Sequence, residues 1–225
     1  MQQLAIYDMD KTITRWPTWT PFLCYAAALG APWRLILLPF VGLCLIGYAC
    51  RAIDRAQLKE LTQALMIGRT VRAAKIDALA SGFAGLVTRR GVYRAARARI
   101  AADRTEGRRI VLATASYGFY ANAIASQLGL DDVIATRSIY SDDGSLLIAR
   151  IDGENCYGPA KLRMIEAWLA DNHMARADIH ARFYSDHVSD APTLAWADEA
   201  IAVNPHAPLR ALAGKRHWSV VDWAR

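Results

Sequence analysis

The stretch Gln3-Leu4-Ala5-Ile6-Tyr7-Asp8-Met9-Asp10-Lys11-Thr12 decides the fold that we expect for this chain. Residues 3–7 form a short apolar run, which predicts a buried strand, and the polar residues that follow predict a loop. Asp8 and Asp10 follow this run and carry two carboxylates. At the end of a strand the backbone turns, so both carboxylates can converge on one site. Convergent carboxylates suit Mg²⁺.

The same pattern of a strand that ends in a polar loop returns twice. Residues 109–116 predict a strand and a small-residue turn, followed by an apolar-periodic helix from about Tyr117 to Leu128. Residues 182–186 predict another strand, with a helical segment after its loop. Strands alternating with helices predict an α/β fold, a doubly wound parallel sheet that binds its ligands beyond the carboxyl ends of the strands. Two more strands are predicted at 133–136 and 200–203, and a hairpin at Asp143-Gly144.

The stretch from about Trp16 to Thr105 differs, because it carries apolar and alanine-rich helical patterns without a convincing strand. Residues 55–66 and 94–103 suit helices. We therefore predict an all-helical cap domain, residues 15–105, inserted into a core domain formed by residues 1–14 and 106–225.

Polar side chains also follow the other predicted strand ends. Thr114 lies beside Ser116 after the second strand, and Lys161 opens a predicted helix. Asp186 and Asp190 follow the third strand. An acidic pair alone is a weak signal, but polar residues at several strand ends of one sheet indicate a single site. His187 lies in the same loop, where we expect it to pack or to be solvated.

With these residues the chain resembles the haloacid dehalogenase superfamily of phosphohydrolases. The four motifs of that family correspond here to residues 8–12, residues 112–116, Lys161, and Asp186 with Asp190. The sequence Asn155-Cys156-Tyr157-Gly158-Pro159-Ala160-Lys161 is similar to a signature of the phosphoserine phosphatase-like branch. The resemblance implies a helical cap between the first two motifs, in agreement with the pattern above.

The resemblance also implies a role for each motif residue. The carboxylates of Asp8 and Asp186 and the backbone carbonyl of Asp10 would bind Mg²⁺, with Asp190 supporting the metal. Asp8 would attack phosphorus to form a phosphoaspartyl intermediate, and Asp10 would act as acid and then as base. Lys161, the Thr114 hydroxyl and the Ala115 amide would hold the phosphate oxygens.

The substrate is less well defined. Phosphoserine phosphatases have an acidic residue shortly after the first motif, whereas residues 11–52 contain no Asp or Glu, which weakens that interpretation. Residues 16–50 are instead apolar, with Arg34 as the only charge, and are similar in hydrophobicity and layout to the cap of bacterial phosphatidylglycerophosphatases. Two substrate classes therefore remain open, a lipid phosphate at the membrane surface and a small soluble phosphomonoester.

The densest part of this apolar stretch, residues 35–50, has three interpretations. Its sixteen residues are fewer than the roughly 20 that span a bilayer. It could form the buried core of the cap. It could instead be an interfacial or re-entrant contact with an anionic membrane, because basic residues flank it. A true membrane span is the third possibility. The flanking residues are Arg15, Arg34, Arg51 and Arg55.

Composition narrows the class of protein. With 225 residues, 54% of them hydrophobic, the chain can bury a substantial core. Its net charge of +6 would permit nucleic acid as a partner, but no nucleic-acid-binding motif is present, so we expect none. Four sparse cysteines and an N-terminus without the order of a signal peptide predict a cytoplasmic protein, with peripheral membrane contact as an option.

A non-catalytic phosphate-sensing or membrane-docking protein with the same fold is the alternative function. Asp10 argues against it, because dehalogenases of the superfamily lack this general acid and its transport ATPases usually carry Thr at that place. Phosphomutases keep the aspartate but usually have a smaller cap, which makes them a minor alternative. The sequence leaves the oligomeric state open.

Overall fold

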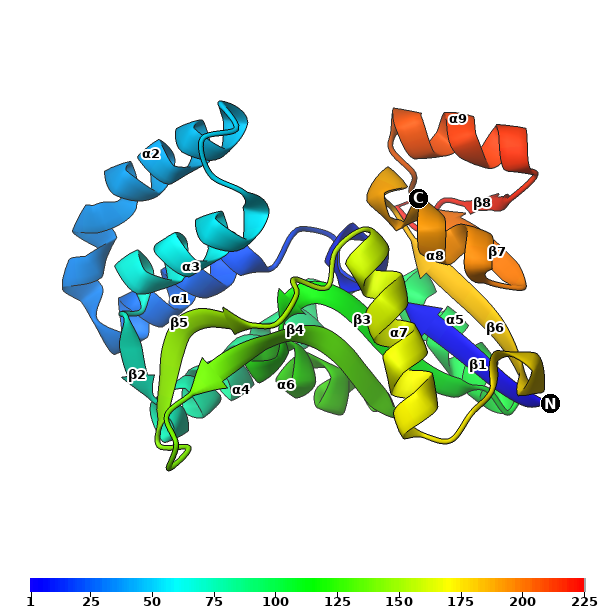
Figure 1. The fold of residues 1–225 in the computed structure, drawn as a ribbon, viewed down its shortest axis with the longest axis horizontal. Coiled ribbons are helices and arrows are strands. Elements are labelled where there is room, and N and C mark those ends of the chain that lie inside the picture. Colours follow the sequence, from blue (N-terminus) through cyan, green and yellow to red (C-terminus); the bar gives the residue numbers. More distant parts are fainter. Residues whose placement is uncertain (225) are drawn as a thin grey trace.

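The computed structural model describes residues 1–224 and shows a sheet with helices on both faces (Figure 1). Strand β1 (Gln2–Tyr7) lies between β3 (Arg109–Tyr117) and β6 (Ile179–Ser185). All pairings from β4 across β3, β1, β6 and β7 to β8 are parallel. The predicted doubly wound sheet is thereby confirmed. The outer strands are β4 (Asp132–Tyr140), β5 (Leu146–Asp152) and β2 (Thr70–Arg72) on one side, and β7 (Glu199–Val203) and β8 (Ser219–Val221) on the other.

The central strand fixes where the site must lie. Leu4 to Tyr7 are completely buried, as expected for a parallel strand that is covered on both faces. Tyr7 pairs with Leu112 of β3 and with Tyr184 of β6, so the chain leaves all three strands at the same edge. Here the Asp8 N–H donates to the Tyr184 carbonyl at 2.9 Å. The motif residues that follow these strands therefore emerge next to one another.

Helices cover both faces of the sheet. On one face α6 (Gly118–Leu128) packs with α4 (Ala73–Arg90) over an apolar core that includes Phe83 and Ile124. Ile165, Leu194 and Leu209 anchor the helices of the other face. These helices are α7 (Pro159–Asp171), α8 (Ala191–Trp196) and α9 (Ala207–Arg216).

Three α-helices and a short 3₁₀ helix form a lobe at one side of the sheet (Figure 1). They are α1 (Trp19–Gly30), the short 3₁₀ helix η2 (Pro32–Leu37), α2 (Leu38–Ala49) and α3 (Arg55–Met66). The bounds of α3 agree with the predicted helix at 55–66. Asp54 begins it with a capping box, in which Asp54 accepts the Gln57 N–H and the Gln57 side chain accepts the Asp54 N–H.

The expectation that residues 16–105 contain no strand is wrong. Residues Thr70–Arg72 form β2, which pairs antiparallel with the second strand of the β4–β5 hairpin. That hairpin turns at the predicted Asp143-Gly144. A strand of three residues is too short to show an alternating pattern, so only its pairing with β5 reveals it.

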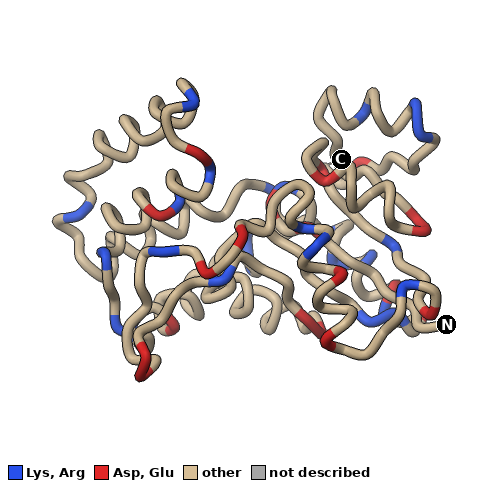
Figure 2. The backbone as a smooth tube through the Cα atoms, viewed as in Figure 1, with Lys and Arg blue, Asp and Glu red and all other residues tan. Residues whose placement is uncertain are grey.

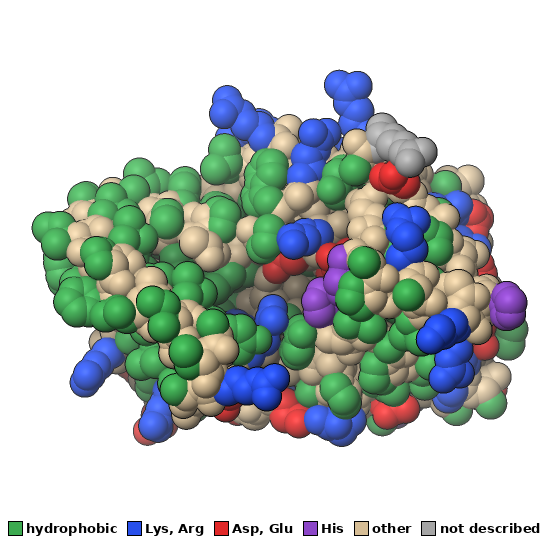
Figure 3. All heavy atoms as spheres, turned by 90° about the horizontal axis from the view of Figure 1, so that it is seen from above, with side chains coloured by type: hydrophobic (Ala, Val, Ile, Leu, Met, Phe, Trp, Pro, Cys, Tyr) green, Lys and Arg blue, Asp and Glu red, His purple; other side chains and the backbone are tan. Residues whose placement is uncertain are grey.

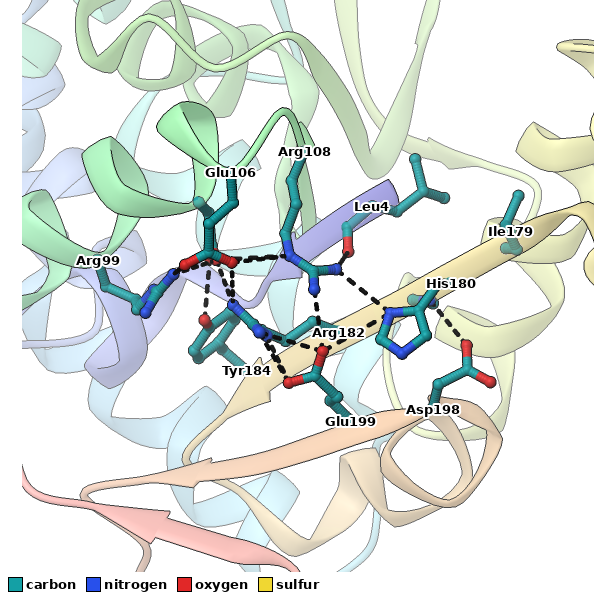
Figure 4. Close-up of polar contacts among 12 residues, drawn as sticks. Leu4, Arg99, Glu106, Arg108, Ile179, His180, Arg182, Tyr184, Asp198 and Glu199 are labelled. Carbon is teal, nitrogen blue, oxygen red and sulfur yellow. Dashed lines mark hydrogen bonds and ion pairs between the residues drawn. The ribbon is translucent and has the colours of Figure 1, made fainter. Parts of the chain in front are cut away.

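Helix α5 (Arg94–Thr105), whose first ten residues were predicted as a helix, is bound to the sheet rather than to the lobe. Its completely buried Asp103 accepts hydrogen bonds from the hydroxyls of Tyr7 and Tyr184, whose rings stack at 4.2 Å. Figure 4 shows the surrounding ion pairs, in which Arg182 lies between Glu106 and Glu199. The domain boundary at residue 105 stays a prediction, but α4 and α5 pack with the core.

The apolar run at residues 35–50 is exposed, so its interpretation as the buried core of the cap is wrong. Within α2 only Val41 is buried. The segment Pro32–Ala49 is, within the described part of the chain, the one helical stretch whose length and composition would allow it to cross a membrane, and 6% of it is buried. Its side chains form the hydrophobic area at the left of Figure 3.

Candidate active site

The chain turns sharply after β1 and brings two carboxylates to one cavity. The turn is η1 (Met9–Ile13), in which Lys11 has a positive φ of 60°. Asp8 and Asp10 both line a cavity of about 240 Å³. All the other predicted site residues line this cavity too. They are Thr114, Ala115, Lys161, Asp186 and Asp190.

Lys161 connects two of these carboxylates. Pro159 starts α7, and the helix places Lys161 beneath the cavity with 2% of its surface exposed. Its Nζ donates to Asp8 Oδ1 at 2.7 Å and to Asp190 Oδ2 at 2.6 Å. Burial alone would lower the pKa of Lys161, but Asp190 and Asp8 raise it above its usual value. Lys161 is therefore a fixed positive charge beside Asp8.

Asp10 is held by a separate set of hydrogen bonds. Its Oδ1 accepts the N–H and the hydroxyl of Thr18, both at 2.8 Å, and its Oδ2 accepts the Ser116 hydroxyl at 3.1 Å. Burial raises the pKa of Asp10, although the hydrogen bonds from Thr18 and Ser116 oppose the shift. A carboxyl group with a raised pKa can hold a proton for a leaving group.

Thr18 is a functional residue that the sequence did not reveal. It occupies the N-cap of α1, where a threonine hydroxyl ordinarily accepts an N–H of the helix. In this structure the Thr18 side chain makes no capping bond and donates to Asp10 instead. A hydroxyl at a helix start looks like a cap in any sequence, so no local signal distinguished the two roles.

The last residues of β3, where the sequence predicted a small-residue turn, stay in the strand and combine a hydroxyl with a hydrogen-bonded backbone. Thr114 Oγ1 accepts the Ser116 N–H at 3.0 Å, and its own hydroxyl hydrogen can still be donated to a ligand. Lys59 of α3, also missed in the sequence, donates to the Ala115 carbonyl at 2.6 Å and to Asn155 Oδ1 at 3.0 Å. Burial lowers the pKa of Lys59 to about 7. The two hydrogen bonds of Lys59 connect the lobe to the end of β3 and to the loop before α7.

The carboxylates of Asp8, Asp186 and Asp190 lie close enough together to affect one another, and a cation would offset their negative charge. Burial raises the pKa of Asp8 to about 7; Lys161 opposes the shift, and Asp190 and Asp186 add to it. Burial and Asp190 raise the pKa of Asp186 to about 6. Asp190 Oδ1 is buried without a hydrogen-bond partner, whereas its Oδ2 also accepts the Ser185 hydroxyl. Oxygen ligands of this kind fit Mg²⁺.

The described residues contain no group of three or more His, Cys, Asp or Glu side chains that could hold a metal by themselves. The ligand set that the resemblance implies also includes a backbone carbonyl and water molecules, which are not part of such a group. Mg²⁺ commonly keeps several waters and needs only one or two protein carboxylates. The individual ligand roles stay predictions.

The mouth of the cavity is basic and aromatic, which the sequence did not predict. Arg55 of α3 lies over the Tyr157 ring, with its Cζ 4.1 Å from the ring centroid. The His187 ring stacks on His206 at 4.4 Å, and its Nδ1 accepts the Ser189 N–H. His187 also lines the cavity, and its ring packs against a neighbour as expected. These residues come from separate segments, so only the fold brings them together.

The comparisons with known proteins agree with this geometry. The family model of haloacid dehalogenase-like hydrolases matches residues 5–195. Protein CicA of Caulobacter vibrioides is 32% identical over 203 residues, which cover 87% of this chain and 83% of that protein. A probable phosphatase of Mycobacterium tuberculosis is 33% identical over 129 residues, 56% of this chain and 42% of that protein. A protein of Streptomyces azureus named "Inhibition of morphological differentiation protein" is 33% identical over 137 residues, which cover 60% of this chain and 47% of that protein. The chain thus spans less than half the length of these last two relatives.

Solved structures with the same fold include two informative examples. A protein of unknown function from Bordetella pertussis has a TM-score of 0.88 and 26% identity, with 99% of each chain covered. A phosphoserine phosphatase with an analogue of its phospho-aspartyl intermediate has a TM-score of 0.62 and 17% identity, with 100% of this chain and 94% of that chain covered. The second likeness shows the fold alone.

Proposed function

Because the chain belongs to the family of haloacid dehalogenase-like hydrolases, we propose that it is a Mg²⁺-dependent phosphomonoesterase that works through a phosphoaspartyl intermediate on Asp8. One observation carries the proposal. Asp8 and Asp10 line the same cavity, yet they have different partners. Asp8 accepts from the buried, charged Lys161 and from the Thr12 hydroxyl at 3.3 Å, whereas Asp10 accepts from uncharged groups of Thr18 and Ser116. Two carboxyl groups with such different surroundings suit two different roles, a nucleophile and an acid.

In the first step an Asp8 carboxylate oxygen forms a bond to phosphorus while the bond from phosphorus to the ester oxygen breaks. Asp10 gives its proton to the departing oxygen, which leaves as an alcohol. Lys161 and the Thr114 hydroxyl would neutralise and orient the phosphate oxygens. The phosphoryl group is then held on Asp8.

In the second step Asp10, now ionised, takes a proton from water as the water oxygen attacks phosphorus. The bond between phosphorus and Asp8 breaks, which releases inorganic phosphate and restores both carboxyl groups. Asp8, Asp186 and the Asp10 carbonyl would hold Mg²⁺, which when bound supplies positive charge against the phosphate dianion.

Two substrate classes remain within this proposal, a lipid phosphate and a small soluble phosphomonoester. The basic residues at the mouth, Lys11 and Arg55, favour substrates that carry negative charge beyond the phosphate. The exposed apolar helix α2 supports the lipid class. The cytoplasmic location expected from the sequence remains a proposal.

A hydrolysis screen tests the function. Purified protein is given soluble phosphomonoesters and lipid phosphates, with and without detergent micelles, in Mg²⁺ or in excess chelator. We expect phosphate release that needs Mg²⁺ and that Asp8→Asn reduces at least about a thousandfold, because the nucleophile is lost while its volume is kept. Phosphate binding without turnover on any substrate would favour the phosphate-sensing alternative.

A further inference from the structure

The lobe presents a continuous apolar surface to solvent, which we call the cap patch. Ile36 is 77% exposed, and Trp33, Leu43 and Ile46 are each 60% exposed. A contiguous group of large apolar side chains with this much exposed surface marks an interaction site. We propose that the cap patch inserts into the surface of an anionic lipid bilayer. Its members are Trp33, Ile36, Leu38, Phe40, Leu43, Leu45, Ile46 and Tyr48.

The distribution of these side chains around α2 favours lipid over a protein partner. Successive residues of an α-helix are about 100° apart, so the exposed Phe40, Leu45 and Ile46 point in three widely different directions. Only Val41 of this helix is buried. A folded partner, or a second copy of the chain, would cover one stripe of the helix, whereas hydrocarbon can surround it. A helix that is hydrophobic all round suits a lipid environment.

The depth of insertion is limited by the ends of the patch. Helix α2 by itself has 12 residues, or about 18 Å at 1.5 Å per residue, so only the whole stretch Pro32–Ala49 approaches the roughly 30 Å of a bilayer core. At one end Arg34 Nη1 donates to the Ala64 and Leu65 carbonyls of α3 at 3.1 and 2.7 Å. At the other end Gly47 O accepts the Ala52 N–H at 2.9 Å. Both ends return to the lobe, so the segment enters and leaves the lipid on one side.

The charges around the patch determine which lipid it fits. Residues 11–52 contain no acidic residue, and the first acid after α2 is Asp54, which caps α3. Basic residues lie at both ends of the patch. Arg51 is exposed after α2, and Lys75 Nζ donates to the Gly30 carbonyl just before η2. Figure 2 shows α2 without an acidic residue and with a basic residue beyond each end. This pattern complements anionic headgroups.

The patch and the active site share one face of the molecule. Figure 3 views this face, with the apolar lobe beside the hollow that contains acidic and histidine side chains. Arg55 belongs to the lining of the active-site cavity and also to a hollow of about 690 Å³ that reaches Tyr48 and Arg51. A docked cap patch would therefore turn the mouth of the cavity toward the bilayer.

Vesicle flotation tests the docking directly. The wild-type chain is floated with phosphatidylcholine vesicles that contain or lack phosphatidylglycerol, at low and high salt. We expect flotation with the anionic vesicles that high salt weakens, since each basic residue near the surface attracts such lipids. Leu43→Ser/Leu45→Ser/Ile46→Ser should reduce binding at least about tenfold, because it removes apolar burial. As a matched control, Tyr140→Ser/Val220→Ser changes exposed apolar residues outside the patch and should float like wild type.

Three results would overturn the proposal. The first is a wild-type chain that stays unbound at low salt, and the second is a triple variant that floats as well as wild type. The third is a wild-type dimer without vesicles that the triple variant converts to a monomer, which would assign the patch to a second copy. Melting temperatures verify that each variant is folded. Since flotation needs no turnover, a chain that floats but hydrolyses nothing would refute the proposed function and leave the docking intact.

Discussion

At the scale of the residue, the site depends on Thr18, whose hydroxyl bonds a carboxylate instead of a backbone N–H of its own helix. Thr18 stands where a helix cap is expected, yet its hydroxyl and its N–H both hold Asp10 Oδ1. Hydrogen bonds to a carboxylate contribute about 1.5–3 kcal/mol each. Thr18 therefore acts as a positioning residue for the proposed acid.

Thr18→Val should lower kcat by about tenfold to a hundredfold for an alkyl phosphate, because Asp10 loses one of its two hydroxyl donors. The loss should be smaller for p-nitrophenyl phosphate, whose leaving group needs little protonation. Thr20→Val, at an exposed threonine two positions on, should leave both rates unchanged. Equal losses for the two substrates would show that Thr18 has only a structural role.

The motif residues could be predicted from the sequence, and their partners could not. Asp8, Asp10 and Lys161 each follow a recognisable strand or open a helix, so topology alone sends them to one edge. Thr18, Lys59 and Arg55 reach the site from the lobe. The local sequences of α1 and α3 do not indicate which distant segments these helices contact, because those contacts depend on tertiary packing.

At the scale of the element, α3 couples the lobe to the sheet through Lys59. Its Nζ is bonded to the Ala115 carbonyl and lies over the Tyr117 ring at 4.1 Å. Burial lowers the pKa of Lys59 from its ordinary 10.5 to about 7. Below about pH 7 the lysine is charged in both the folded and the unfolded chain. Between pH 7 and 10.5 the unfolded chain keeps the proton and the folded chain does not.

This difference predicts how stability changes with pH. Because the unfolded state binds more protons in that window, raising the pH from 7 to 9 should increase the free energy of unfolding of wild type relative to Lys59→Met. Urea unfolding of both proteins at pH 7, 8 and 9 measures the difference, in which contributions from other groups cancel. Lys215→Met, at an exposed lysine, should follow wild type at every pH. A constant gap between wild type and Lys59→Met would contradict the prediction.

Long elements followed their sequence patterns, and elements that depend on distant pairing did not. Helix α3 agrees with its predicted bounds, since an acidic cap and an apolar stripe define it locally. Strand β2 exists only through its ladder to β5. The apolar run of α2 looked like either core or membrane contact, because hydrophobicity does not specify what covers it.

At the scale of the whole molecule, the buried Asp103 joins α5 to the two central strands. Besides both tyrosine hydroxyls, its carboxylate pairs with Arg182 of β6 and, at 2.7 Å, with Arg99. Removing one partner of a buried ion pair leaves uncompensated charge and costs about 3–5 kcal/mol.

Asp103→Asn should therefore lower the melting temperature by roughly 6–20 °C, at about 2–4 °C per kcal/mol for a chain of this size. Glu106→Gln, at a more exposed acid of the same cluster, should lower it far less. Scanning calorimetry provides both values. Melting temperatures that fall equally in the two variants would mean that burial of Asp103 adds nothing.

The covalent step at Asp8 is the centre of the proposed function. The most direct measurement quenches the enzyme during turnover of a phosphomonoester with Mg²⁺, reduces it with borohydride, and maps its peptides by mass spectrometry. Borohydride converts an aspartyl phosphate to homoserine, so homoserine should occur at position 8, and Asp8→Asn should yield none. Substrate hydrolysis at full rate with no homoserine at position 8, while a control acyl phosphate is reduced, would contradict the account.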